Sequence, residues 1–203
     1  GDVYRTAGQL ERAIRTTREA LALNRRVYGS GHYRVGETMG NLAGYEMEAG
    51  NLAAADTLFR GCIALLEANH DESLALPAFR LYRGNLCLDL DRLVEADTLY
   101  ASAWAGLDSA NAAMRGYCGD VLLGRARVRV RQGRVAEADA FAASGLRFKR
   151  GELAETDPSL LDPWFCVAEV QWLSGRAGEA LRSLGRAKRC GATAADAARF
   201  PKL

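Results

Sequence analysis

The chain has 203 residues, of which 49% are hydrophobic, and its 27 Lys and Arg against 25 Asp and Glu give a formal net charge of +2. This near balance argues against a dominant nucleic-acid-binding surface. No apolar run reaches the roughly 20 residues that cross a bilayer, and the first residues lack the apolar core of a signal peptide. We therefore expect a folded cytoplasmic protein with neither a nucleic-acid nor a membrane partner.

A short pattern recurs along the chain with a period of about 42 residues. A turn residue is followed five residues later by an alanine, and further small residues lie seven before the turn residue and seven after the alanine. The alanines are Ala13, Ala55, Ala96, Ala138 and Ala180, in steps of 42, 41, 42 and 42. The turn residues are Gly8, Gly50, Asp91, Gly133 and Gly175. Small side chains let the two helices of a hairpin cross closely, and Gly or Asp suits the turn between them.

The segments on both sides of each turn carry apolar residues at the i, i+3, i+4, i+7 spacing of an amphipathic helix. In chain order, the sequence predicts a partial repeat over 1–28, with a helix over 9–28. Four repeats follow, at 32–68 (helices 32–49 and 52–68), 74–108 (74–90 and 93–108), 111–149 (111–132 and 135–149) and 159–190 (159–174 and 177–190). Residues 192–203, with a helix over 194–200, are predicted to be a C-terminal cap. Asp157 before Pro158 is typical of a helix start.

The five cysteines have neither the even number of a disulfide framework nor the CxxC spacing of a zinc site. We expect them to be reduced thiols on apolar helix faces. They are Cys62, Cys87, Cys118, Cys166 and Cys190. No metal ion or other cofactor is predicted.

The triplet of small positions, the turn glycine and the nearby aromatic residues resemble the tetratricopeptide repeat. The period of about 42 residues, instead of 34, resembles the kinesin-light-chain-like variety. So does the block over 20–43, in which a Gly29-Ser30-Gly31-His32 loop is followed by Asn41-Leu42-Ala43. The resemblance covers nearly the whole chain and implies an all-α fold, a right-handed superhelical α-solenoid of antiparallel helix hairpins. The chain departs from the family pattern at Arg83 and Arg125, in place of large apolar residues, and at Asp91, in place of the turn glycine.

The resemblance also implies a concave groove that is lined by the first helix of each repeat and binds protein or peptide partners. By register, the predicted groove residues are Asn41, Glu48, Tyr82, Asn85, Asp89, Arg127, Arg131, Phe165, Glu169 and Trp172. The alternative is that they are ordinary surface or packed residues. The two-carboxylate clamp of some tetratricopeptide domains is not supported, because only its asparagines match.

The run from Arg125 to Arg131 has an arginine at every second position. On a helix, Arg125 and Arg129 share one face and Arg127 and Arg131 another. Such a stripe could clamp an acidic peptide, a carboxylate or a phosphate. The interpretation that we favour is a solvated face, paired with Asp120, Glu137 and Asp139.

Catalytic motifs are missing from the sequence. The only histidines are His32 and His70, both in predicted loops, and there is no HExxH, GxSxG or P-loop motif. His32 is expected to cap a helix. We therefore predict that the protein is not an enzyme.

The function predicted is a protein–protein interaction scaffold within a larger regulatory protein. Gly1 and Tyr4 match late first-helix positions of a repeat whose beginning is absent, so an upstream domain in the same polypeptide is expected. The resemblance and the composition suggest a bacterial signalling protein. The alternative is a ligand- or peptide-sensing domain of a signalling or transcription regulator. An enclosed apolar pocket would favour sensing, whereas an open polar groove would favour scaffolding.

Overall fold

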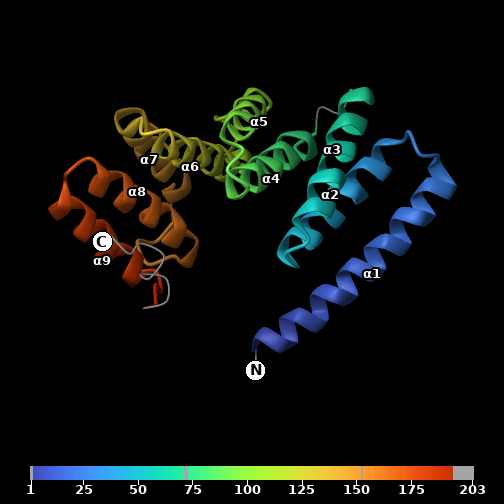
Figure 1. Cartoon of the computed structure of the whole chain (residues 1–203), viewed down its shortest axis with the longest axis horizontal. Helices are drawn as coiled ribbons and strands as arrows, with labels where there is room; N and C mark the ends of the chain where they lie inside the picture. Colours follow the sequence, from blue (N-terminus) through green and yellow to red (C-terminus); the bar gives the residue numbers. More distant parts are fainter. Residues whose placement is uncertain (1, 71–72, 152, 194–203) are drawn as a thin grey trace.

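The structure, a computed structural model, describes residues 2–70, 73–151 and 153–193, and of residues 2–7 only the backbone. All regular secondary structure in these residues is helical. Figure 1 shows helix hairpins that follow one another along an arc, from α1 at the blue end to α9 at the red end. The predicted all-α solenoid is confirmed.

The helices pair in chain order. After α1 (Asp2–Tyr28), the hairpins are α2 (Tyr33–Glu48) with α3 (Leu52–Ala68), α4 (Ala75–Asp89) with α5 (Leu93–Ala105), α6 (Arg115–Arg131) with α7 (Val135–Arg150), and α8 (Leu161–Leu173) with α9 (Ala177–Arg189). Short 3₁₀ helices, η1 (Ala112–Met114) and η2 (Pro158–Leu160), precede α6 and α8. The predicted hairpin helices are confirmed, with most ends shifted by one or two residues. The cap helix predicted over 194–200 lies outside the described residues.

The turns within the hairpins have the predicted backbone geometry. Gly50, Gly133 and Gly175 have φ of 80°, 72° and 75°, and Asp91 has φ of 57° at the equivalent place. Positive φ is easy for glycine and tolerable for aspartate. The small residues around these turns are buried in every case: Ala43, Ala55, Cys62, Gly84, Ala96, Ala103, Ala126, Ala138, Gly145, Ala168, Ala180 and Ala187. They let the paired helices approach closely, as the repeat pattern predicts.

The turn predicted at Gly8 is wrong. Helix α1 continues through Gly8, so the helix predicted over 9–28 starts earlier, and Ala20 is exposed instead of buried. A glycine inside a helix costs only about 1 kcal/mol relative to alanine. Gly8 is therefore accommodated within α1 and does not by itself force a turn.

Two predicted helix starts are confirmed. The Nδ1 atom of His32 accepts a hydrogen bond from the backbone N–H of Arg34 at 3.2 Å and caps α2. The Oδ1 atom of Asp157 accepts one from the N–H of Ser159 at 2.9 Å, at the start of η2. Both side chains satisfy backbone donors that the first helical turn leaves unpaired.

The core runs along the arc as a series of clusters and not as one central mass. The largest cluster joins residues of α2 to α6, and smaller clusters lie between α1 and α2, between α6, α7 and α8, and around α8 and α9. All five cysteines are buried free thiols, as predicted. In the described part of the chain, no helix is long and apolar enough to cross a membrane.

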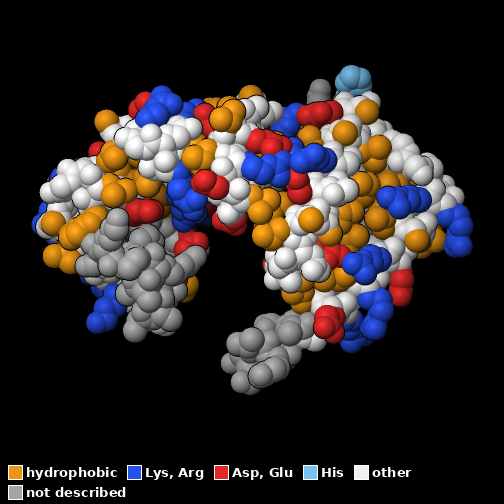
Figure 2. All heavy atoms as spheres, viewed as in Figure 1, with side chains coloured by type: hydrophobic (Ala, Val, Ile, Leu, Met, Phe, Trp, Pro, Cys, Tyr) orange, Lys and Arg blue, Asp and Glu red, His pale blue; other side chains and the backbone are white. Residues whose placement is uncertain are grey.

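The first helices of successive hairpins form the inner layer of the arc. Helix α2 contacts α4, α4 contacts α6, and α6 contacts α8. Figure 2 shows the hollow between the two ends of the arc, with acidic and basic side chains beside each other on the visible face. Side chains on the inner layer are therefore brought together from segments about 40 residues apart in the sequence.

Candidate functional site

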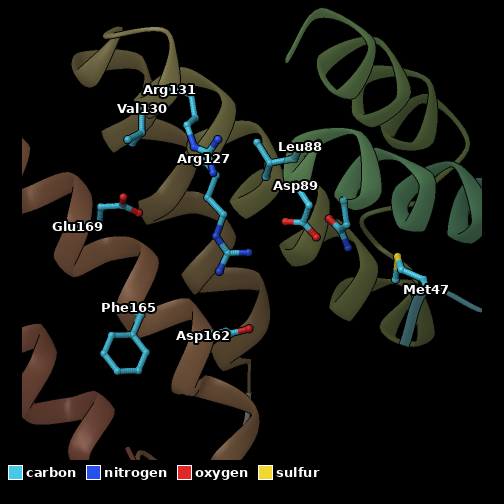
Figure 3. Close-up of a pocket in the computed structure, with 10 residues that line it drawn as sticks. Met47, Leu88, Asp89, Arg127, Val130, Arg131, Asp162, Phe165 and Glu169 are labelled. Carbon is cyan, nitrogen blue, oxygen red and sulfur yellow. The ribbon is translucent and has the colours of Figure 1, made fainter. Parts of the chain in front are cut away.

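Two adjacent cavities lie on the inner layer. The central cavity, of about 440 Å³, is bounded by α4, α6 and α8 (Figure 3). The side cavity, of about 350 Å³, lies between α2 and α4. Met47 lines both cavities, so they are neighbouring parts of one groove. Both are open to solvent and carry polar as well as apolar side chains.

Nine of the ten predicted groove residues line one of these cavities. Asn85, Asp89, Arg127, Arg131, Phe165 and Glu169 line the central cavity, and Asn41, Glu48 and Tyr82 line the side cavity. Phe165 is part of the cavity wall and offers little surface to a ligand, because only 3% of the residue is exposed. Trp172, on α8, lines neither of the two cavities.

A glycine lets α2 and α4 approach each other at the side cavity. A Cβ atom on Gly40 would lie 2.5 Å from Cε1 of Phe79, which no real side chain tolerates. By contrast, a Cβ atom on Gly44, one turn further along α2, would meet no atom within 4 Å. Gly40 therefore serves the packing, whereas Gly44 leaves room in the cavity.

Tyr100 of α5 holds the wall of the central cavity in place. Its ring is wholly buried between α4 and α6, where Gly84 and Gly124 leave space for it. The Tyr100 hydroxyl donates a hydrogen bond to Oδ1 of Asn85 at 2.7 Å. Burial raises the pKa of Tyr100, so this hydroxyl keeps its proton. The bond fixes one of the groove residues from behind.

Arg127 occupies the middle of the central cavity. Figure 3 shows its guanidinium between Glu169 on one side and Asp89 and Asp162 on the other. Burial by itself lowers the pKa of Arg127, but nearby groups, among them Cys166 and Asp162, raise it above its usual value. The guanidinium is thus charged and half-buried, with acidic side chains around it.

Glu169 lies in the same cavity, and its pKa is also raised. Burial raises the pKa of its carboxyl group, and the charges of Arg127 and Arg131 offset this only in part. A cation placed close to Glu169 would lower its pKa and favour the ionised form. The cavity can therefore interact electrostatically with a charged group of a ligand, as a binding site requires.

The arginines of α6 divide between two faces, as predicted. Arg127 and Arg131 line the central cavity. Arg125 and Arg129 point away from it and bond Asp97 of α5, at 3.3 and 3.0 Å, and Arg129 also bonds Glu137 at 3.2 Å.

Two of the carboxylates expected to pair with these arginines have other partners. Asp120 pairs with Lys149 at 2.9 Å, and Asp139 pairs with Arg176 at 2.5 Å. The expected pairing with Asp120 and Asp139 is therefore wrong, and only that with Glu137 is confirmed. The reason is that Arg125 and Arg129 lie between α7 and the preceding hairpin, where they reach Asp97.

A parallel arrangement accounts for Arg83, which replaces an apolar residue of the family pattern. Its Nε atom bonds Oδ1 of Asp56 at 2.9 Å, and Nη1 of Arg92 bonds the other oxygen of Asp56 at 2.7 Å. Glu95 also accepts hydrogen bonds from both arginines. The charged side chain is thus neutralised where hairpins meet, so it is tolerated in a position that is only 11% exposed.

Sequence reasoning missed Asp56 and Asp97 and gave Asp139 the wrong partner, although a signal for these inter-hairpin pairs was present. Asp56, Asp97 and Asp139 each directly follow a crossing alanine of the repeat, at steps of 41 and 42. It also missed Asp162 in the central cavity. Asp162 lies seven residues before Glu169 on α8, so extending the helical face by two turns would have found it.

Comparisons with known proteins agree with this geometry. Residues 1–68 match the sequence model of the tetratricopeptide repeat. No curated protein sequence matches the chain.

The solved structures with a similar fold include the following three. The nearly identical TPR-like repeats of a Podosopora anserina putative kinesin light chain are 18% identical, with a TM-score of 0.68 over 100% of this chain and 93% of that one. MamA protein is 18% identical, with a TM-score of 0.58 over 92% and 85%. BtubC (BKLC) from P. vanneervenii is 16% identical, with a TM-score of 0.54 over 96% and 93%.

These similarities place the chain among the α-solenoids built from TPR-like repeats. Residues 1–68 carry tetratricopeptide repeats by sequence, and the chain as a whole has the fold of kinesin-light-chain-like TPR proteins.

Proposed function

We propose that this protein is an interaction scaffold that binds a peptide or a protein surface in the groove formed by the central and side cavities. Stacked helical repeats generally serve protein–protein interaction through the extended concave surface that their curvature creates. The observation that carries the proposal is the adjacency of the two cavities at Met47, because a shared wall lets one extended segment occupy both. Tetratricopeptide scaffolds are typically not enzymes, and we propose no catalytic role.

The form of the cavities supports scaffolding over ligand sensing. A sensing pocket would enclose a small molecule and be lined mostly by apolar side chains. Here both cavities are open, and exposed polar residues such as Asn41, Glu48 and Asp89 line them. The five buried free thiols fit a reducing compartment, so we propose a cytoplasmic location. That the module acts within a larger regulatory protein remains an expectation from the resemblance.

A steric block tests the proposal. Gly44→Leu places a side chain in the side cavity without strain, because nothing lies within 4 Å of its Cβ position. Gly185→Leu is the matched control, since Gly185 on α9 also has open space around it and lines neither cavity. We expect peptides selected from a random display library on the wild-type chain to lose binding to Gly44→Leu but not to Gly185→Leu. Equal binding to both variants would contradict a role for the groove.

A further inference from the structure

The charges of the groove are opposite in sign to those of the chain. The ionisable side chains that line the groove are Glu48, Asp89, Asp162, Glu169, Arg127 and Arg131. Four carboxylates against two guanidiniums give a formal charge of −2. The whole chain carries +2. The groove is therefore a local concentration of negative charge on a protein that is otherwise slightly basic.

The two arginines of the groove are less available to a ligand than its two exposed carboxylates. Arg131 already bonds Asp91 at 3.1 Å, a residue that lines neither cavity. Arg127 is half-buried among the carboxylates of α8, which act as its counter-charges. By contrast, Glu48 and Asp89 are exposed, and neither forms an ion pair with a described residue. Each cavity thus presents an exposed carboxylate to solvent.

The surroundings of these carboxylates suit an organic cation. Asp89 on α4 points into the central cavity (Figure 3). In the side cavity, Glu48 is accompanied by Tyr82, which is 36% exposed. A Lys or Arg side chain gains from a carboxylate through charge-assisted hydrogen bonds and from an aromatic face through cation–π attraction. In the described part of the chain, no group of three or more His, Cys, Asp and Glu residues is placed to hold a metal ion.

We infer that the groove recognises a basic, extended peptide segment. One Lys or Arg side chain enters the central cavity beside Asp89, and a second enters the side cavity against Glu48 and Tyr82. The inference rests on the proposed function and names its partner class. It reverses the idea of an arginine clamp for acidic peptides, because Arg125, Arg129 and Arg131 bond carboxylates of the chain itself.

The same random peptide library tests this inference. We expect the peptides selected on the wild-type chain to be enriched in Lys and Arg over the input library, and their binding to weaken as salt is raised. The double variant Glu48→Gln with Asp89→Asn should weaken a selected peptide by about tenfold or more, from the loss of charge-assisted bonds. Glu67→Gln is the control, because it removes a carboxylate that is also exposed but pairs with Arg80 and lines neither cavity.

The possible outcomes separate the two proposals. Selected peptides rich in Asp and Glu would overturn the basic-partner inference but leave the groove as a binding site. So would peptides that lose binding to Gly44→Leu while binding the double variant and the wild type equally well. If selection enriches no peptide that Gly44→Leu fails to bind, the groove itself is not the binding site, and both proposals fail. Circular dichroism of each variant shows whether it is folded.

Discussion

Gly124→Ala is the sharpest test of how the inner layer is packed. A Cβ atom at Gly124 would lie 2.7 Å from Cε1 of Tyr100 and 2.8 Å from its hydroxyl oxygen. The ring cannot move away, because on its other side a Cβ position at Gly84 is also only 2.7 Å from the same Cε1 atom. Shifting the ring would also break its hydrogen bond to Asn85. One methyl group therefore pushes on a rigid, confined side chain.

Two effects of opposite sign decide the magnitude. Replacing a helical glycine by alanine gains up to about 1 kcal/mol of helix propensity. Overpacking a full core costs about 1–3 kcal/mol, and a ring confined on both sides favours the upper end of that range. We expect Gly124→Ala to be destabilised by about 2 kcal/mol net. Gly185→Ala, with no atom within 4 Å of its Cβ position, should instead be stabilised by up to about 1 kcal/mol.

The assay is urea denaturation followed by circular dichroism, with both variants compared with the wild type. A double-mutant cycle identifies the cause: in a Tyr100→Leu background, where the ring is gone, Gly124→Ala should lose most of its cost. A Gly124→Ala protein as stable as Gly185→Ala would refute the packing described for Tyr100. An unchanged cost in the Tyr100→Leu background would show that the ring is not the obstacle.

Three further predictions concern the charges and the turns. Burial alone raises the pKa of Asp56, but hydrogen bonds from Arg92 and other arginines outweigh it and lower the pKa to about 2. Because the pKa of Asp56 is lower in the folded state, its ionised form stabilises the fold at pH values above the unfolded pKa. Between about pH 4 and about pH 2 the wild type should therefore lose about 2 kcal/mol of unfolding free energy. Asp56→Asn should not show this loss, and urea midpoints measured against pH would test the difference. Ala96→Trp and Ala138→Trp should each destabilise by about 1–3 kcal/mol or more in the same assay, because both sites are wholly buried; two neutral variants would contradict the helix crossings. Asp91→Gly should raise the melting temperature slightly, since it relieves a positive φ on a non-glycine residue, and a lowered value would mean that the exposed pair with Arg131 matters more than we expect.

The sequence by itself determined the helices, the turns and the helix crossings. These features depend on short-range properties: apolar spacing selects a helical face, a positive φ selects Gly or Asp at a turn, and close helix approach requires small side chains. For that reason Gly50, Asp91 and Ala96 could be assigned correctly from spacing alone. The same reasoning failed at Gly8, where the pattern is present but α1 continues as one helix, because a single glycine does not by itself end a helix.

Only the tertiary structure decided which charges meet and which residues share a cavity. Arg125 bonds Asp97 instead of Asp120, and Trp172 lies outside the cavities that Asp162 enters. These outcomes depend on the rotation of each hairpin against the next, and that rotation follows from packing between hairpins, such as the ring of Tyr100 between two glycines. A repeat period locates equivalent positions along the chain, but it does not contain the angle between successive hairpins. That angle determines whether equivalent positions converge into a groove or turn away from it.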